Sequence, residues 1–281
     1  MNAFLGKKLC IATAHQKEIA IASVVEQGLG VECIVPAHLD TDSLGTFSGE
    51  ISRNGNVLET LRAKCTLAMK ENDPMDFVLA SEGSFGAHPS SPFLPADYEM
   101  VLLLDVKNGK EYSGSYWTTD TNFSAATIKD EDEMEAFLNR VGFPSHGLIL
   151  RKDAQSFDPI YKGIISEEKL WSHYHYLKDT FGSVYAETDM RALYNPKRMH
   201  AIGKAAENLV VNIKSLCPSC EAPGFSIIKM ESGLPCAWCK QPTRSPLFAL
   251  RKCGDCGMEQ KDFYPHQKKE EEPNYCDYCN P

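Results

Sequence analysis

Apolar residues follow two different rhythms along the first eighty residues. Short, continuously apolar runs at 8–14, 31–35 and 76–81 are typical of strands buried in a sheet. Between them, apolar residues at 16–28 and 57–71 recur at the three- and four-residue intervals of a helix with one buried face. This alternation of strands and helices predicts an α/β architecture, a mixed sheet with flanking helices.

A β-hairpin is predicted further along. Two β-rich runs, YEMVLLLDV and EYSGSYWTT, flank Asn108-Gly109, a dipeptide that favours hairpin turns. The preceding stretch HPSSPFLPAD is interrupted by prolines and predicts a loop, as does the polar, glycine-containing stretch 37–56.

The pattern continues through the middle of the chain. Asp130 and Glu133 have the spacing of a capping box that begins a helix at 131–140. The other predicted elements are strands at 146–151, 160–165 and 183–187 and helices at 167–179 and 197–214.

The last part of the chain changes in composition. Of 11 cysteines, eight lie after residue 216. They form four C-x-x-C knuckles: Cys217/Cys220, Cys236/Cys239, Cys253/Cys256 and Cys276/Cys279. Four thiolates make a closed tetrahedral zinc site, so eight predict two structural zinc ions. Disulfides or a redox C-x-x-C motif are weaker interpretations of four consecutive knuckles.

The spacing of the knuckles indicates how they pair. Gaps of 15 residues after Cys220 and 19 residues after Cys256 both fit the usual interval within one zinc site. We therefore expect neighbouring knuckles to pair in sequence, with an interleaved arrangement as the alternative. Short strands are expected between the knuckles, and the boundary falls near Ser215. This divides the chain into an α/β domain at 1–214, a candidate for nucleotide or phosphate binding, and a double zinc-binding domain at 215–281.

Composition and charge restrict the class of protein. With 281 residues, 43% hydrophobic and 24% charged, the chain is an ordinary folded protein. The longest tight apolar run, Met100 to Leu104, is too short to cross a membrane, and the N-terminus lacks the features of a signal peptide. We therefore expect a cytoplasmic protein without membrane contact. The net charge is −9, and neither domain is basic, which argues against non-specific nucleic-acid binding.

Two turns near the ends of predicted strands are candidates for phosphate chemistry. Thr13, His15 and Lys17 lie where the first strand meets a helix N-terminus, whose free amides attract phosphate. Arg191 and Arg198 lie at a later strand-to-helix turn, and guanidinium groups suit phosphate or carboxylate. Ordinary turn composition and structural ion pairs are the alternatives.

Acidic residues supply candidates for metal binding and acid–base catalysis. Glu82 ends an apolar strand, where an unpaired charge is costly, so we interpret it as functional. Glu59 and Lys64 lie on one predicted helix and could serve a metal-bound nucleotide, or form ion pairs on an exposed face. The loop 40–50 combines carboxylates, hydroxyls and glycines that suit Mg²⁺, or form a solvated turn.

Nearly the whole chain resembles a family of bacterial proteins described only as a domain of unknown function. The stretches that carry this resemblance are DTDSLGTFSGEI, RAKCTLAM, ASEGSFGAHPSSPFLPAD, VGFPSHGLILR, ETDMRALYNPKRM, GLPCAWC and YCDYCNP. This resemblance implies no activity.

The first eighty residues are also similar to the inosine-triphosphate pyrophosphatase group. Thr13 and Lys17 match its phosphate loop, although His15 replaces an asparagine. Glu59 and Lys64 keep its helical spacing, and Glu82 stands where a related branch has a single acid followed by glycine. The resemblance implies Mg²⁺-dependent removal of pyrophosphate from nucleoside triphosphates, with Arg191 or Arg198 in place of its last arginine motif.

Two functions of different classes follow from these patterns. The first is a Mg²⁺-dependent nucleoside-triphosphate pyrophosphatase or phosphohydrolase in which Glu82 and Glu59 are catalytic. Thr13, His15, Lys17, Lys64, Arg191 and Arg198 would bind the nucleotide. The alternative is a non-catalytic protein whose zinc tail binds a macromolecular partner. Sequence-specific nucleic-acid binding by the tail is a third hypothesis, which its nearly neutral charge disfavours.

Overall fold

The computed structural model describes residues 3–37, 39–44, 56–71, 74–88 and 91–281. Its contacts divide the chain into an N-terminal unit, Met1–Val210, and a C-terminal unit, Val211–Pro281. The division falls within the helix α5 (Pro196–Lys214). The glycine-containing stretch expected to be a loop at 37–56 lies mostly outside the described residues, apart from a short 3₁₀ helix η1 (Asp42–Leu44).

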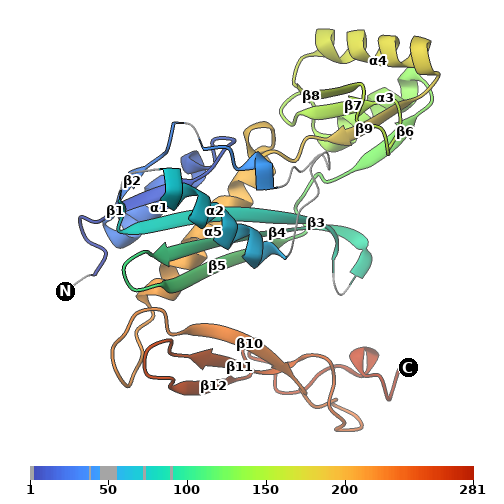
Figure 1. The fold of residues 1–281 in the computed structure, drawn as a ribbon. Helices are drawn as coiled ribbons and strands as arrows, with labels where there is room; N and C mark the ends of the chain where they lie inside the picture. Colours follow the sequence, from blue (N-terminus) through green and yellow to red (C-terminus); the bar gives the residue numbers. More distant parts are fainter. Residues whose placement is uncertain (1–2, 38, 45–55, 72–73, 89–90) are drawn as a thin grey trace. The chain divides into compact units, whose positions relative to one another are not determined.

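A five-stranded mixed sheet forms the centre of the N-terminal unit, in the order β2-β1-β3-β4-β5 (Figure 1). The first three strands, β1 (Lys8–Ala12), β2 (Glu32–Ile34) and β3 (Phe77–His88), are parallel. The strands β4 (Ser91–Asp105) and β5 (Lys110–Thr118) continue the sheet in antiparallel pairing. The expected α/β class, a mixed sheet with flanking helices, is confirmed.

Helices cover both faces of this sheet (Figure 1). The helix α2 (Val57–Glu71) packs Leu61 and Cys65 against apolar side chains of β1, β3 and β4. On the other face, α5 approaches β5 so closely that a Cβ atom at Gly114 would lie 2.2 Å from the backbone nitrogen of Leu209. The helix α1 (Glu18–Leu29) packs beside α5.

The hairpin of β3 and β4 is longer than its sequence suggests. The proline-containing stretch HPSSPFLPAD, expected to be a loop, belongs mostly to the two strands, and Ala87 pairs with Pro95. This is tolerated because β5 begins its pairing with β4 only at Asp97, so Pro95 has a free edge on that side. The predicted hairpin of β4 and β5 is confirmed, with the left-handed φ of +65° at Gly109.

A second sheet contains the strands that follow. It has the antiparallel order β6-β9-β7-β8, formed by β6 (Ala125–Ile128), β7 (Leu148–Arg151), β8 (Ile160–Ile164) and β9 (Val184–Thr188). The helices α3 (Glu131–Val141) and α4 (Glu167–Phe181) bury its inner face with Phe137 and Leu170 among others. The sequence pattern did not predict β6 or the separation into two sheets. The capping box is confirmed, because Asp130 accepts the amide of Glu133 at 2.9 Å. A 3₁₀ helix, η2 (Ala192–Tyr194), leads into α5.

The C-terminal unit is a three-stranded antiparallel sheet of β10 (Ser226–Ser232), β11 (Pro246–Lys252) and β12 (Glu259–Phe263). A 3₁₀ helix, η3 (Pro273–Tyr275), precedes the last knuckle. The buried cluster here consists of Cys217, Phe225 and Cys253, so the unit has little apolar core of its own. Over the described residues of the whole chain, no helix is both long and apolar enough to span a membrane.

Candidate metal centres and a buried charged cluster

Two groups of four cysteines meet in the C-terminal unit. The first cysteine centre consists of Cys217, Cys220, Cys253 and Cys256, and the second of Cys236, Cys239, Cys276 and Cys279. Within each centre, all four Sγ atoms lie within 4.8 Å of one another. Each group can therefore hold one zinc ion.

The sulfur distances fit zinc ligation. In the first centre the Sγ atoms of Cys217 and Cys256 are 3.6 Å apart, and in the second those of Cys239 and Cys276 are also 3.6 Å apart. Four sulfurs at about 2.3 Å from a tetrahedral zinc ion would lie about 3.8 Å from one another, whereas a disulfide bond measures about 2.05 Å. The arrangement is that of a closed, structural zinc site.

Each knuckle turns its backbone amides toward sulfur or into a tight turn. The amide of Asp255 donates to the Sγ of Cys253 at 3.4 Å, and the amide of Ser219 donates to that of Cys217 at the same distance. Hydrogen bonds from the amides of Cys256 and Asp255 lower the pKa of Cys253 to about 6, against the effect of burial. The thiolate that zinc requires is thus stabilised by the fold.

The pairing of the knuckles corrects the sequence-based expectation. We expected neighbouring knuckles to share a zinc ion, whereas the structure interleaves them, the first with the third and the second with the fourth. The reason is the antiparallel pairing of β10 with β11, which places Ser226 opposite Lys252. The knuckle before β10 and the knuckle after β11 therefore lie at the same end of the sheet.

A different set of polar groups is buried in the N-terminal unit. The strand β1 pairs with β3 only as far as Ala12 and Ala80, so the next carbonyl of β3, that of Ser81, is free to accept other donors. The Nζ atoms of Lys17 and Lys64 donate to it at 3.2 Å and 3.3 Å. The carboxylate of Glu82, only 3% exposed, forms an ion pair with Lys64.

The opposite face of the same two strands carries further charges. Arg198 donates from Nε to Oε1 of Glu99 at 2.6 Å, and both residues are fully buried. Asn195 accepts the amide of Arg198 at the start of α5, which orients the first helical turn toward β4. A Cβ atom at Gly83 would lie 2.3 Å from Oε1 of Glu99, so a glycine is needed beneath this carboxylate. With Asp97, which is 1% exposed, these residues complete what we term the charged cluster: Lys17, Lys64, Glu82, Asp97, Glu99 and Arg198.

The cluster perturbs its own titration. Burial, and then the positive charges of Lys64 and Arg198, lower the pKa of Lys17 from 10.5 to about 7. Burial, and then the negative charge of Glu99, raise the pKa of Asp97 from 3.8 to about 8. At neutral pH, Asp97 is therefore mostly protonated, and three basic groups face two ionised carboxylates.

Several oxygens near this cluster have no hydrogen-bond partner among the described residues. They are Oδ1 of Asp97, Oε2 of Glu99 and Oγ of Ser81. Buried carboxylate oxygens in this state are costly, and oxygen donors of this kind suit Mg²⁺.

The other residues singled out from the sequence lie in several places. Thr13 is buried, and its hydroxyl donates to the carbonyl of Ala14 at 2.8 Å. His15 and Gln16 take left-handed φ angles of +66° and +58° in the turn that leads to Lys17. Such strain in non-glycine residues is sustained where surrounding structure requires it, as at binding sites.

Glu59 and Arg191 have other partners. The carboxylate of Glu59 is exposed and accepts the amide of Asn56 at 2.9 Å, while Asn56 accepts the amide of Glu59 at 3.0 Å. Glu59 therefore forms a capping box at the start of α2. Arg191 binds Asp189 and lies over the ring of Tyr194. No described contact joins Glu59 or Arg191 to the charged cluster.

Asp97 and Glu99 were not identified from the sequence. Both lie in the run PADYEMVLLLD, where Asp97, Glu99, Val101 and Leu103 alternate onto one face of β4. The alternation indicated that the two acids share a face. It did not indicate that this face is buried by α5, because α5 follows almost a hundred residues later.

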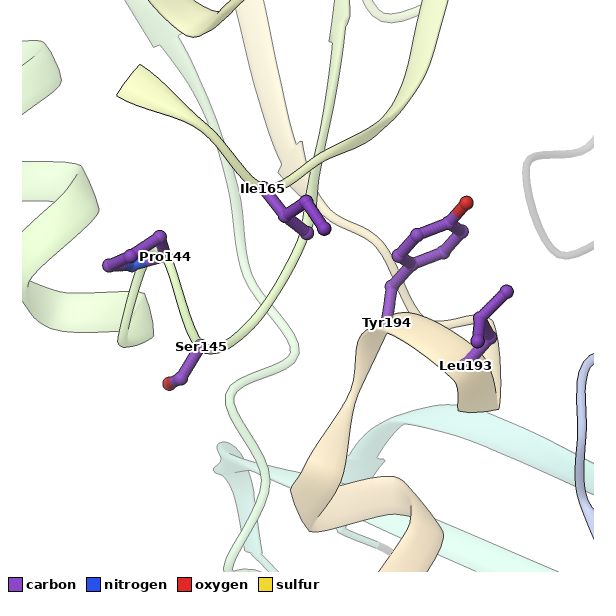
Figure 2. Close-up of a pocket in the computed structure, with 5 residues that line it drawn as sticks. All are labelled: Pro144, Ser145, Ile165, Leu193 and Tyr194. Carbon is purple, nitrogen blue, oxygen red and sulfur yellow. The ribbon is translucent and has the colours of Figure 1, made fainter. Parts of the chain in front are cut away.

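Two hollows adjoin these elements. The hollow in Figure 2 is wide and open and is lined by Pro144, Ser145, Ile165, Leu193 and Tyr194, none of which is charged. A smaller, more enclosed one is lined by Phe85, Phe123, Arg191 and neighbouring residues. The ring of Phe85 also lies 5.2 Å from the guanidinium carbon of Arg198, so this smaller hollow adjoins the charged cluster.

The molecule is thus an α/β protein with an appended unit that carries two four-cysteine centres. Residues 64–281 match a domain of unknown function (DUF6671), and the chain belongs to this family. The matched region contains all eight knuckle cysteines and most of the charged cluster, but begins after Lys17. No curated protein matches the chain.

Proposed function

We propose that the N-terminal unit is a Mg²⁺-dependent hydrolase that cleaves a phosphoanhydride bond of nucleoside triphosphates. The observation that carries the proposal is the charge balance of the charged cluster. Three basic side chains, Lys17, Lys64 and Arg198, converge on two ionised carboxylates inside the protein. A bound phosphate would neutralise the surplus positive charge, and it would raise the pKa of Lys17 back toward its ordinary value.

The residues of the cluster supply the parts that such a reaction needs. Lys17 and Lys64 would bind the phosphate oxygens, and the dipole of α1, which begins directly after Lys17, favours an anion there. Glu82 would accept the proton of the attacking water once the phosphate engages Lys64. Magnesium, when bound, would neutralise charge that develops on the phosphate oxygens.

The smaller hollow suggests where the nucleoside lies. Its aromatic walls, Phe85 and Phe123, have ring centroids 5.7 Å apart, and Arg191 lies beside them. Because the cluster is buried, substrate entry requires side chains to move, and a cavity already adjoins the cluster at Phe85.

The proposal is tested by turnover of a panel of nucleoside triphosphates with Mg²⁺, measuring release of phosphate and of pyrophosphate separately. We expect Glu82→Gln to lower kcat at least 100-fold. Glu111→Gln is the matched control, because Glu111 is an exposed carboxylate paired with Arg62 on another part of the sheet. Wild-type protein without turnover of any nucleotide, or equal rates in both variants, would overturn the assignment.

The second cysteine centre supports a second candidate function, the binding of a macromolecular partner by the C-terminal unit. Trp238 and Tyr278 occupy the same position in their two knuckles and are 78% and 66% exposed. Tyr275, just before the last knuckle, is also 66% exposed. The first centre has small or polar residues at these positions, Ser219 and Asp255. Exposed aromatic side chains of this kind are common at the centre of protein interfaces.

This candidate is tested by affinity capture with the zinc-loaded chain. We compare wild type with the triple variant Trp238→Ala, Tyr275→Ala and Tyr278→Ala, after both are shown to hold two zinc ions. A partner that the wild type captures and the variant loses would support the candidate. Identical captured proteins would exclude this aromatic surface.

A further inference from the structure

Two acids on β4 form a donor set that the ion pairs of the cluster leave incomplete. Asp97 and Glu99 are two residues apart on one strand and lie opposite Phe85 and Gly83 of β3, so both side chains share one face of the sheet. Each is at least 99% buried, and each has one oxygen, Oδ1 or Oε2, without a hydrogen-bond partner among the described residues. Ser81, on the same face of β3, leaves its buried hydroxyl oxygen in the same state.

The basic groups nearby do not account for these oxygens. Arg198 engages Glu99 through Oε1, which leaves Oε2. Lys64 pairs with Glu82, which lies on the opposite face because it is opposite Met100 in the register. An ion or an ordered group is therefore missing from the face that Asp97 and Glu99 share.

We propose that Asp97 and Glu99 bind a divalent cation of the magnesium class. Their donors are hard carboxylate oxygens, with no imidazole or thiolate to favour zinc or copper. Among the described residues, groups of three or more acidic, histidine or cysteine ligands occur only at the two cysteine centres. A site with two carboxylates leaves most of the coordination sphere to water and to a ligand, which is how Mg²⁺ is held when it also binds substrate phosphates.

This inference rests on the proposed function only for the identity of that completing ligand, a phosphate. It moves the metal away from Glu59, which caps α2, and assigns the two faces of the β3–β4 pair different tasks. One face would hold the metal and the other would hold Glu82 with Lys64. The bare Cα of Gly83 lets the carboxylate of Glu99 lie over β3.

The test measures Mn²⁺ binding to the zinc-loaded full chain, without nucleotide, by loss of the electron paramagnetic resonance signal of free Mn²⁺. Mg²⁺ is then added as competitor. We expect one Mn²⁺ site per chain that Mg²⁺ displaces, and at least tenfold weaker binding in Asp97→Asn. Glu99→Gln should behave alike, but it removes the partner of Arg198, so circular dichroism must first show that it folds.

Two matched variants separate the metal site from the catalytic proposal. Glu82→Gln should lose turnover yet bind Mn²⁺ as tightly as wild type, and Glu111→Gln should change neither. If the wild type binds Mn²⁺ as inferred but hydrolyses no triphosphate, the function is wrong and the site stands. The inference is overturned if the wild type binds no Mn²⁺, or if folded Asp97→Asn binds it unchanged.

Discussion

The cysteine centres and the charged cluster both gather polar groups from distant parts of the chain, but they act on stability in opposite directions. The cysteine centres lie in a unit with a very small apolar core, so a bound metal would supply the free energy that folds it. The charged cluster lies within a large apolar core, where it costs free energy that the surrounding packing must offset. A group that stabilises a fold is visible as a structural element, whereas a group that destabilises it points to function.

The largest expected effect is that of metal removal on the C-terminal unit. A structural zinc ion contributes about 10–16 kcal/mol in small zinc domains, so chelation should unfold the unit outright. The N-terminal unit, which has its own cores, should keep its secondary structure. Circular dichroism and limited proteolysis before and after a strong chelator would show this. Proteolytic resistance of the chelated C-terminal unit would contradict the comparison.

Paired substitutions test the interleaved arrangement directly. Replacing Cys217 and Cys253 by serine should remove one zinc ion per chain, because both belong to the first centre. Replacing Cys217 and Cys236 should remove both ions, because each centre then lacks one ligand. Sequential pairing would reverse these two results. Zinc is counted by inductively coupled plasma mass spectrometry.

The two regions also differ in how much their sequences reveal. Cysteines in C-x-x-C knuckles are rare enough that residue type alone predicted two metal centres and all eight ligands. Their pairing was wrong, because it depends on which strand ends adjoin, and β10 and β11 had no strong pattern: four consecutive residues of β10 are exposed. Local spacing therefore identified the ligands, while the sheet register determined their partners.

For the charged cluster the reverse holds. Lysine, glutamate and arginine are common surface residues, so only Glu82, at the end of an apolar run, was identified for a physical reason. Lys17, Lys64 and Arg198 were among the candidates, but so was Glu59, and nothing local separates a buried acid from an exposed cap. Burial by α5 depends on tertiary packing over a long sequence distance, which the pattern does not encode.

The next largest effect concerns the buried ion pair between Arg198 and Glu99. Arg198→Met should lower the free energy of unfolding of the N-terminal unit by about 3–5 kcal/mol, because Glu99 is then left as an uncompensated buried charge. Adding Glu99→Gln should restore a large part of this loss. Urea unfolding of the single and double variants measures the coupling, and equal stabilities would show that the pair is not buried as described.

Lys17 should show the opposite sign. Its folded pKa of about 7 lies below the usual 10.5, so between these values the unfolded chain binds the proton and the folded chain does not. The contribution of Lys17 to stability is therefore unfavourable below about pH 7 and rises with pH up to about 10.5. Lys17→Met should be more stable than wild type by about 2 kcal/mol at pH 6.5, with the difference shrinking by pH 9.5. Urea unfolding at both values tests this, and a variant less stable at pH 6.5 would contradict it.

The smallest expected effect marks the edge of the charged cluster. Glu59 contacts the backbone of Asn56 as part of a capping box, and glutamine serves that role nearly as well as glutamate. Glu59→Gln should therefore change stability by less than about 0.5 kcal/mol, whereas Asn56→Ala, which removes the N-cap side chain, should cost about 1 kcal/mol. Neither change should alter Mn²⁺ affinity or turnover, because both residues act on the start of α2 alone. A tenfold loss of either property in Glu59→Gln would return Glu59 to the metal site and would show that the capping box gives way when substrate binds.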